Sequence, residues 1–405
     1  MKSKLVAATL FSLTAAVVVT YPAYQSLGAP FQIDSKPVID VLASNHIVNE
    51  KPRIEVVFVL DTTASMSGLI DAAKEKIWSV ASTMASAQSS PEIKMGLVAY
   101  RDRGDAYITQ TIDLTYDLDS MYATLMDFEA AGGGDGPESV NQALHEAVHN
   151  ISWSQDDNTY RVVFLVGDAP AHMDYQDDVK YPVTIAAASL KGIVVNAIQC
   201  GTDSSARDIW QQIAQLGNGD YFQVDQSGSA IAIATPFDEE LAKLSAELND
   251  TRMTFGDAEE QRKAEIKSKA IDKLEKLASV ESKARRAAFN ATESGERNLL
   301  GSNELVHAVI TGEVDLTSIE KENLPVALQP LTPSARKKII EDVALVRNEL
   351  QLKIHELSQD RSSFIREKIE EAGGARQSLD DKIYRAVKSQ AASVGLVYES
   401  EAAEY

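Results

Sequence analysis

Short apolar runs alternate with helical patterns through the first half of the chain. Nearly continuous apolar runs of strand length occupy residues 54–60, 93–100, 160–166 and 192–200, and residues 107–114 alternate as an edge strand does. Helical stretches lie between and after them, at 68–87, 118–128, 138–151, 179–190 and 204–216. This alternation predicts an α/β fold: a doubly wound, mainly parallel sheet with helices on both faces. Ligand sites in such sheets lie beyond the carboxyl ends of the strands.

From about Pro236 the pattern changes to helices alone. Residues 236–249 read as one helix, and residues 258–288 are rich in Lys, Glu and Ala with helical spacing. Thr332-Pro333 is typical of a helix start, because a capping residue precedes a proline at the first helical position. Four apolar residues then lie seven apart: Val343, Leu350, Leu357 and Phe364. This repeat favours helix-on-helix packing or a coiled coil, and an ordinary amphipathic helix is the alternative.

The amino terminus has the pattern of an export signal. Lys2 and Lys4 precede an apolar run over residues 5–19, which is short for a membrane-spanning helix. We expect residues 1–28 to be a signal peptide, or else an uncleaved anchor, and residues 29–52 to be a linker. The mature protein would then be periplasmic, or anchored in the inner membrane of a bacterium and facing the periplasm. Two regions follow, a sheet domain over 53–251 and a helical, partly coiled-coil-like region over 252–405.

Composition narrows the choice of partners. The chain of 405 residues is 44% hydrophobic and 24% charged, which is ordinary for a globular protein. Its net charge of −21 argues against nucleic acid, and against an anionic membrane surface except through an amino-terminal anchor, because phosphates would be repelled. The single cysteine, Cys200, excludes an intrachain disulfide and a cysteine-cluster zinc site.

Candidate metal ligands follow the first strand. Asp61 stands at its carboxyl end, and Thr63 and Ser65 follow at alternate positions, so a tight loop would direct all three oxygens to one point. A carboxylate and two hydroxyls are hard ligands that suit Mg²⁺ or Mn²⁺ rather than zinc. Asp168 ends another buried strand in an equivalent place. A third loop, Gly132-Gly133-Gly134-Asp135-Gly136-Pro137-Glu138, has four glycines that allow unusual backbone conformations.

These residues resemble the von Willebrand factor A (VWA) family and its metal-ion-dependent adhesion site (MIDAS). The motif D-x-S-x-S of that family reads Asp61-x-Thr63-x-Ser65 here, and Asp168 matches the last metal-site aspartate. The resemblance covers about residues 53–251. The glycine loop is similar to the Gly-Gly-Gly-Asp-x-Pro-Glu of a hemicentin-like subset, and it places Glu138 where the family usually has a threonine.

The resemblance implies a non-catalytic protein-binding module that depends on a divalent cation. The cation would be Mg²⁺, or else Mn²⁺ or Ca²⁺, with one coordination position left for an acidic side chain of a protein partner. Glu138, or else Asp135, would contribute from the middle loop, and Asp168 would hold a coordinated water. A third carboxylate would weaken the pull on an acidic ligand, or fill the open position until a partner displaces it. The helical region would supply a stalk, a surface for oligomerisation or a second docking surface.

Two alternatives remain open on the residues alone. His145-Glu146-Ala147-Val148-His149 spells H-E-x-x-H, which on a helix can hold zinc and polarise a water, as in zinc metalloproteases. No third ligand is evident nearby, and the histidines flank an apolar helix face as solvated residues would. The second alternative is a structural scaffold in which the metal only braces the domain.

Overall fold

The structure, a computed structural model, describes residues 51–134, 136–226, 233–371 and 379–400. The expected signal or anchor over residues 1–28, nearly all of the expected linker and Asp135 lie outside the described residues. Among the helices of the described ranges, none has the length and apolar content needed to cross a membrane.

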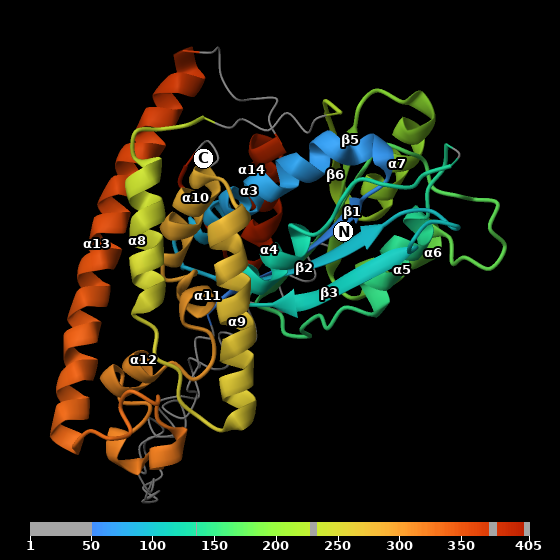
Figure 1. Ribbon diagram of the computed structural model, residues 1–405. Coiled ribbons are helices and arrows are strands. Elements are labelled where there is room, and N and C mark those ends of the chain that lie inside the picture. Colours follow the sequence, from blue (N-terminus) through green and yellow to red (C-terminus); the bar gives the residue numbers. More distant parts are fainter. Residues whose placement is uncertain (1–50, 135, 227–232, 372–378, 401–405) are drawn as a thin grey trace, which may run out of the picture. The chain divides into compact units, whose positions relative to one another are not determined.

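A six-stranded sheet forms the centre of the amino-terminal half (Figure 1). The strands are β1 (Arg53–Asp61), β2 (Glu92–Tyr100), β3 (Thr109–Thr115), β4 (Thr159–Gly167), β5 (Ile193–Cys200) and β6 (Asn218–Val224). Their order is β3-β2-β1-β4-β5-β6. Every pairing is parallel except that of the edge strand β3 with β2. The doubly wound, mainly parallel sheet is therefore confirmed.

Helices cover both faces because successive side chains of the central strands point to opposite sides. Val57 and Val59 of β1 belong to a core with α5 (Val140–His149), α6 (Tyr181–Leu190) and α7 (Ser204–Leu216). Val56 and Leu60 belong to a second core on the other face, with α3 (Ser67–Ala85) and α4 (Leu118–Leu125). Each helix was expected from the sequence, although most begin or end one to three residues from the expected limits.

The carboxyl-terminal half is helical, as predicted. Its helices are α8 (Asp238–Asp250), α9 (Ala258–Leu277), α10 (Val280–Asn290), α11 (Glu296–Leu300), α12 (Leu305–Ile310), α13 (Pro333–Glu371) and α14 (Leu379–Gln390). The stretch 258–288, which has helical spacing, is divided between α9 and α10. The Ser279 side chain caps the second of them by accepting a hydrogen bond from the backbone N–H of Ser282.

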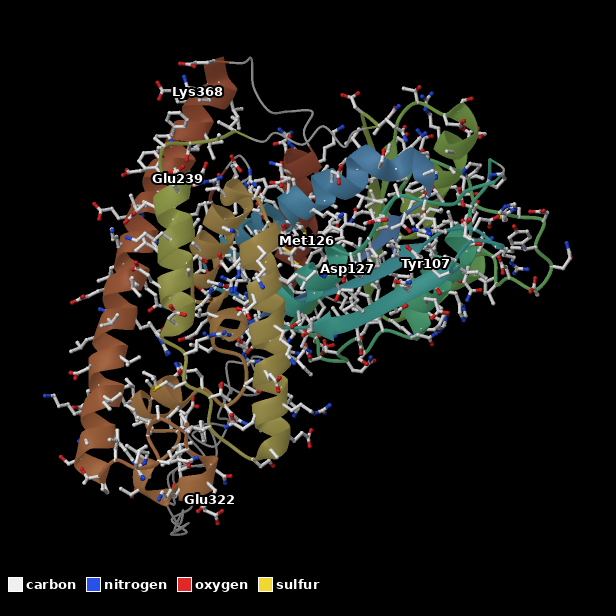
Figure 2. All side chains as sticks on the ribbon, viewed as in Figure 1. Tyr107, Met126, Asp127, Glu239, Glu322 and Lys368 are labelled. Atoms are coloured by element: carbon white, nitrogen blue, oxygen red, sulfur yellow. The ribbon has the colours of Figure 1, made fainter. Side chains whose placement is uncertain are left out.

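The long helix α13 begins at Pro333, as Thr332-Pro333 predicted, and runs antiparallel to α8 (Figure 1). Figure 2 shows this arrangement, with Glu239 at the start of α8 beside the end of α13 that carries Lys368. The predicted heptad residues of α13 are only half-buried. The fully buried line lies three residues earlier in each repeat, at Ile340, Arg347, Ile354 and Arg361. The repeat therefore reflects packing of α13 against other helices of the same chain. A coiled coil between two copies of the chain stays a prediction.

Two buried arginines of that line bind acids from distant segments. Arg347 donates two hydrogen bonds to the Glu304 carboxylate, at 2.8 and 3.0 Å, and Arg361 Nε lies 2.7 Å from Asp238 Oδ1. Because each charge is paired, the helix can bury its polar positions without leaving a lone ion in a low-dielectric interior.

Segments of the helical region complete the core on one face of the sheet. Leu274 of α9, Phe289 of α10 and Val387 of α14 belong to the same hydrophobic cluster as Val56 and Leu60 of β1. A bidentate ion pair between Asp119 of α4 and Arg286 of α10 lies beside this cluster, with N···O distances of 2.5 and 2.7 Å. The sheet and the helices that follow it are thus held by shared apolar packing and by buried charge.

Candidate metal centre

The parallel register brings the ends of β1, β2 and β4 to one edge of the sheet. Asp61, the last residue of β1, pairs with Tyr100 of β2, and Leu60 pairs with Val166 of β4. Gly167, the last residue of β4, and Asp168, which follows it, therefore lie beside Asp61. A Cβ atom added to Gly167 would lie 3.1 Å from Asp61 Oδ2 and 2.5 Å from the Tyr100 hydroxyl, so only glycine fits between them.

The loop after β1 gathers the three predicted oxygens. Asp61 Oδ1 accepts hydrogen bonds from the backbone N–H of Thr63 at 2.9 Å and from its hydroxyl at 2.7 Å. The hydroxyls of Thr63 and Ser65 are 3.2 Å apart. Asp61 and Thr63 are almost fully buried, whereas Ser65 is exposed. The alternate spacing of these residues does what the sequence predicted, because it turns the three side chains toward one another.

The glycine loop closes over this cluster. Gly132 and Gly133 both have φ of +80°, a conformation that side chains rarely adopt, and a Cβ atom on Gly132 would strike the Asp105 carboxylate at 2.3 Å. The same carboxylate accepts a hydrogen bond from the N–H of Gly133 at 3.0 Å. A Cβ atom on Gly133 would meet Glu138 Oε1 at 3.4 Å and Thr63 Cβ at 3.5 Å, so Glu138 and Thr63 approach this glycine together.

Glu138 belongs to the loop rather than to the helix that follows. The helix α5 begins at Val140, two residues later than expected. The backbone of Glu138 pairs with the segment after β4: its N–H donates to Pro170 O at 2.9 Å, and its carbonyl accepts from His172 N–H at 3.1 Å. This pairing holds the middle loop next to the Asp168 loop. Glu138 is 4% exposed, and its Oε2 has no hydrogen-bond partner among the described residues.

Asp168 is half-buried and is held by Gln226, which follows β6. Gln226 Nε2 donates to Asp168 Oδ2 at 2.6 Å and to the carbonyl of Ser65 at 3.2 Å, so one amide ties the first loop to the third. Sequence reasoning missed Gln226, because no motif surrounds it. Only its position after a parallel strand could have drawn attention to it.

The cluster carries negative charge in a buried setting. Burial raises the pKa of Asp61 to about 7; hydrogen bonds from Thr63 oppose the shift, and the charge of Asp168 adds to it. Burial raises the pKa of Glu138 to about 9, and the charges of Asp61, Asp102, Asp105 and Asp168 raise it further. The Tyr100 hydroxyl is buried and has no hydrogen-bond partner in the described part of the chain, and its pKa is also raised by burial and by Asp61 and Glu138.

Sequence reasoning also missed the two aspartates behind the cluster. Asp102 is nearly buried and accepts hydrogen bonds from the Ser139 hydroxyl at 2.8 Å and the Tyr175 hydroxyl at 2.9 Å. Asp105 holds the glycine loop. Both follow β2 in the turn to β3, where Asp105 ends the tripeptide Arg103-Gly104-Asp105, a sequence that does not point to a metal centre. Their carboxylates hold loop residues by hydrogen bonds, and their negative charges raise the pKa of Glu138.

The donor set fits a hard divalent cation. Asp61 Oδ2 and Glu138 Oε2 are buried oxygens without hydrogen-bond partners among the described residues, and the Thr63 and Ser65 hydroxyls lie beside Asp61. In the described ranges, no three His, Cys, Asp or Glu side chains are grouped so as to hold a metal by themselves. A cation here would depend on hydroxyls and water as well as carboxylates, which suits Mg²⁺ better than zinc.

The H-E-x-x-H motif lies on α5 with its two rings adjacent. The ring centroids of His145 and His149 are 4.4 Å apart, and Glu146 accepts hydrogen bonds from Gln142 and Asn150. The helix buries the apolar face that the sequence predicted, against the sheet. Since the described residues bring no third protein ligand to this pair, the geometry gives the zinc-protease alternative no support.

Comparison with known proteins agrees with this fold. Residues 55–236 match the family model described as von Willebrand factor A domain. The alpha-protein kinase vwkA of Dictyostelium discoideum is 27% identical over 120 residues, which are 29% of this chain and only 19% of that protein.

Solved structures with a similar fold share little sequence with this chain. The SpRpn10 VWA domain has 13% identity and a TM-score of 0.34, over 44% of this chain and 91% of that one. Proximal thread matrix protein 1 from the mussel byssus, described with a zinc-occupied MIDAS motif, has 14% identity and a TM-score of 0.34, over 43% and 42%. The family match and the strand order together show that this chain contains a von Willebrand factor A domain.

Proposed function

We propose that the VWA domain binds Mg²⁺, or else Mn²⁺ or Ca²⁺, and through it recognises an acidic group of a protein partner without catalysis. The observation that carries this proposal is a pair of buried oxygens, Asp61 Oδ2 and Glu138 Oε2, that have no hydrogen-bond partner among the described residues. The Thr63 hydroxyl hydrogen bonds to the same Asp61 carboxylate, and Glu138 and Thr63 approach Gly133 together. Unpaired buried carboxylate oxygens are costly, and a cation would stabilise them. VWA domains in general serve protein interaction.

Each side chain has a distinct part in this proposal. Asp61, Thr63 and Ser65 would supply ligand oxygens, and Asp168, oriented by Gln226, would hold a coordinated water. Glu138 would occupy the coordination position that faces the partner, and a carboxylate of the partner would displace it. Asp135, the alternative ligand, lies outside the described residues.

Neighbouring threonines provide a matched test of cation binding. Thr63→Val removes the hydroxyl that faces Asp61. Thr62→Val removes a hydroxyl that is equally buried but hydrogen bonds to the Tyr100 carbonyl at 2.9 Å and the Tyr107 hydroxyl at 2.7 Å. We expect titration calorimetry with Mg²⁺ to show at least a tenfold loss of affinity in Thr63→Val and little change in Thr62→Val. Equal affinities in the two variants would contradict the proposed ligand set.

Metal content distinguishes this proposal from the alternatives. A zinc protease would retain stoichiometric zinc that is lost in His149→Ala but not in Thr63→Val. A scaffold would gain thermal stability from Mg²⁺ in the native protein without any Mg²⁺-dependent capture of acidic peptides. The proposed recognition module requires both the stabilisation and the capture, and both are lost in Thr63→Val. The kinase named among the relatives shares too little of its length to suggest a phosphoryl-transfer activity for this chain.

We also propose that the protein is exported across the bacterial inner membrane, with the metal centre in the periplasm. Lys2, Lys4 and the apolar run that follows support this proposal. A fusion of residues 1–60 to a reporter that is active only outside the cytoplasm tests it. Loss of reporter activity after Leu10→Arg supports export, since a charge in the apolar run blocks signal recognition. An inactive reporter in the unchanged fusion would contradict export.

A further inference from the structure

A cavity at the carboxyl-terminal end of α3, the end away from the metal loop, has an unusual lining. It has a volume of about 570 Å³ and lies between the last turns of α3, helix α10 and the second half of α13. Its lining includes seven serines and three arginines, Arg285, Arg361 and Arg366, and no Asp or Glu among the described residues that line it. The chain as a whole has 60 acidic against 39 basic residues, so a lining of cations and hydroxyls is distinctive.

Two of these arginines are buried close together. Arg285 is 3% exposed and Arg361 is 2% exposed. Burial lowers the pKa of Arg361, and the positive charge of Arg285 is the next largest cause, so the two guanidinium groups are neighbours. Carboxylates outside the lining contact both groups: Arg285 Nη1 lies 3.5 Å from the Glu75 carboxylate, and Arg361 Nε lies 2.7 Å from Asp238 Oδ1.

Several polar atoms of the lining have no partner. Arg285 Nε, Ser82 Oγ and Ser358 Oγ are buried and lack hydrogen bonds within the described ranges. Each is a donor, and a buried donor without an acceptor is unfavourable. Arg366, at the exposed side of the cavity, donates to Ser363 Oγ at 3.3 Å and forms no ion pair within the described ranges. The cavity therefore offers positive charge and unused donors on three helices.

We propose that this cavity binds a small phosphate monoester, with its phosphoryl oxygens accepting hydrogen bonds from Arg285, Ser82 and Ser358. Guanidinium groups and hydroxyls match the several acceptor oxygens of a phosphoryl group. The volume exceeds that of a free phosphate and falls in the range of small-molecule sites, so the phosphoryl group would carry an organic portion. The site is separate from the metal centre, since Ser67 at the start of α3 and Ser79 in the cavity lining are roughly 18 Å apart along that helix.

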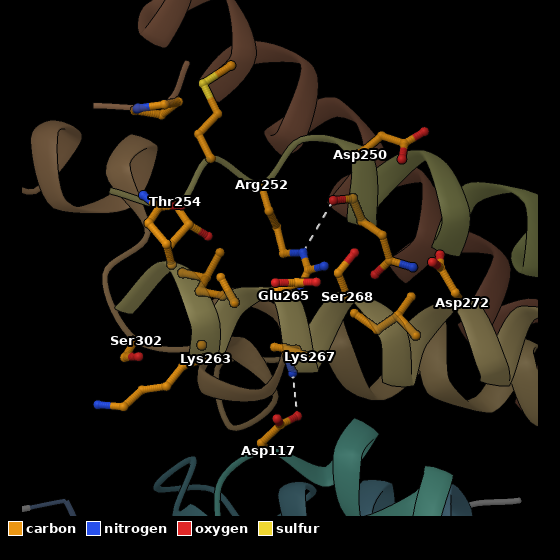
Figure 3. Close-up of a pocket in the computed structure, with 18 of the residues that line it drawn as sticks. Asp117, Asp250, Arg252, Thr254, Lys263, Glu265, Lys267, Ser268, Asp272 and Ser302 are labelled. Atoms are coloured by element: carbon orange, nitrogen blue, oxygen red, sulfur yellow. Dashed lines mark hydrogen bonds and ion pairs between the residues drawn. The ribbon is translucent and has the colours of Figure 1, made fainter. Parts of the chain in front are cut away.

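A larger cavity beside α9 has a weaker chemical signature (Figure 3). Its volume is about 1180 Å³, and both signs of charge alternate in its lining. Lys267 pairs there with Asp117 at 2.6 Å, and Arg252 Nε donates to the Asn249 carbonyl at 3.3 Å. Because these charges neutralise one another within the lining, this cavity does not select a ligand class as the arginine and serine cavity does.

Calorimetry on the full chain tests the proposal, with a chelator present so that phosphate cannot act through a bound cation. The probes are glycerol 3-phosphate and inorganic phosphate, compared with chloride at matched ionic strength. We expect saturable binding of one glycerol 3-phosphate per chain and weaker binding of inorganic phosphate. Absence of saturable binding, or equal affinity for both probes, would overturn the monoester assignment.

Variants that preserve the fold locate the site. Ser82→Ala removes a hydroxyl that has no hydrogen-bond partner among the residues the structure describes, and Arg366→Gln changes an exposed side chain. Neither should therefore lower the melting temperature without ligand. Each should weaken glycerol 3-phosphate binding roughly tenfold, as expected for one hydrogen bond to a charged group. Arg262→Gln, an exposed arginine of α9 outside the cavity, is the matched control. Unchanged binding in both test variants, or an equal loss in the control, would overturn the site. Thr63→Val should bind normally, which separates this test from that of the metal centre.

Discussion

Gly167 shows how closely the carboxylates of the metal centre pack. A methyl group there would lie 3.1 Å from Asp61 Oδ2 and 2.5 Å from the Tyr100 hydroxyl, and Tyr100 is fully buried and cannot move aside easily. We expect Gly167→Ala to destabilise the fold by about 1–3 kcal/mol, as overpacking does, and to weaken Mg²⁺ binding by displacing Asp61. Urea unfolding and Mg²⁺ titration measure the two effects.

The matched control for that change is Gly136→Ala in the glycine loop. A Cβ atom at Gly136 would meet no neighbour within 4 Å, so this variant should keep both stability and Mg²⁺ affinity. If Gly167→Ala binds Mg²⁺ as the unchanged protein does, Asp61 does not contribute to cation binding from the position that the structure gives it.

At the scale of residues, the sequence identified the cluster but not its supports. Asp61, Thr63 and Ser65 were recognisable because they follow a buried strand at alternate positions, and Asp168 because it ends a parallel neighbour. Their convergence is therefore a consequence of the sheet topology. Gln226 and Asp105 act through loop contacts, and loop contacts leave no periodic pattern in a sequence.

Among the helices, the sequence pattern did not predict which charged residues are buried. The start of α13 was predictable from Thr332-Pro333, because capping is local. Its buried line was not, since Arg347 and Arg361 read as exposed residues until Glu304 and Asp238 are known to face them. Hydrophobic periodicity predicts that a helix is present. It does not predict the buried face correctly when arginines are among the residues on that face.

The ion pair between α4 and α10 gives a prediction about acid stability. Opposite charges on Arg286 and Lys267 hold the pKa of Asp119 below its usual range, against the effect of its complete burial. A carboxyl whose folded pKa is depressed contributes stability above its unfolded pKa, about 3.9, and loses it as the pH falls through the folded value. We expect Asp119→Ala to cost about 3–5 kcal/mol at pH 7, because it leaves Arg286 buried and unpaired.

The stability of that variant relative to the unchanged protein should also depend on pH. The difference between them should shrink as the pH falls below about 4, since the unchanged protein then loses the contribution of the Asp119 carboxylate. Thermal unfolding from pH 3 to 7 measures this. Asp272→Ala, an exposed aspartate of α9, should show neither the cost nor the pH dependence. A constant difference at all pH values would argue against the ion pair.

At the scale of the molecule, the sequence predicted both architectures but not their shared core. Leu274, Phe289 and Val387 come from three helices of the carboxyl-terminal half, yet they pack in the cluster that contains Val56 of β1. An amphipathic helix has the same pattern whichever surface covers its apolar face, so no sequence pattern distinguishes a stalk from a helix that completes a sheet domain. The shared core decides how the protein should unfold.

Because apolar packing is continuous between sheet and helices, the chain should unfold in a single transition. Trp78 and Trp210, packed on opposite faces of the sheet, report the sheet domain by fluorescence, whereas circular dichroism reports mainly the helices. Val387→Asp would bury an unpaired charge on α14 and should reduce the free energy of unfolding by about 3 kcal/mol or more. The urea midpoints from fluorescence and from circular dichroism should then fall together. Val183→Asp, the same change at a 63% exposed position of α6, should leave both midpoints in place. If Val387→Asp shifted only the circular dichroism transition, the sheet domain would be independent of α14. A joint shift would instead make the carboxyl-terminal helix a structural part of the domain that carries the metal centre.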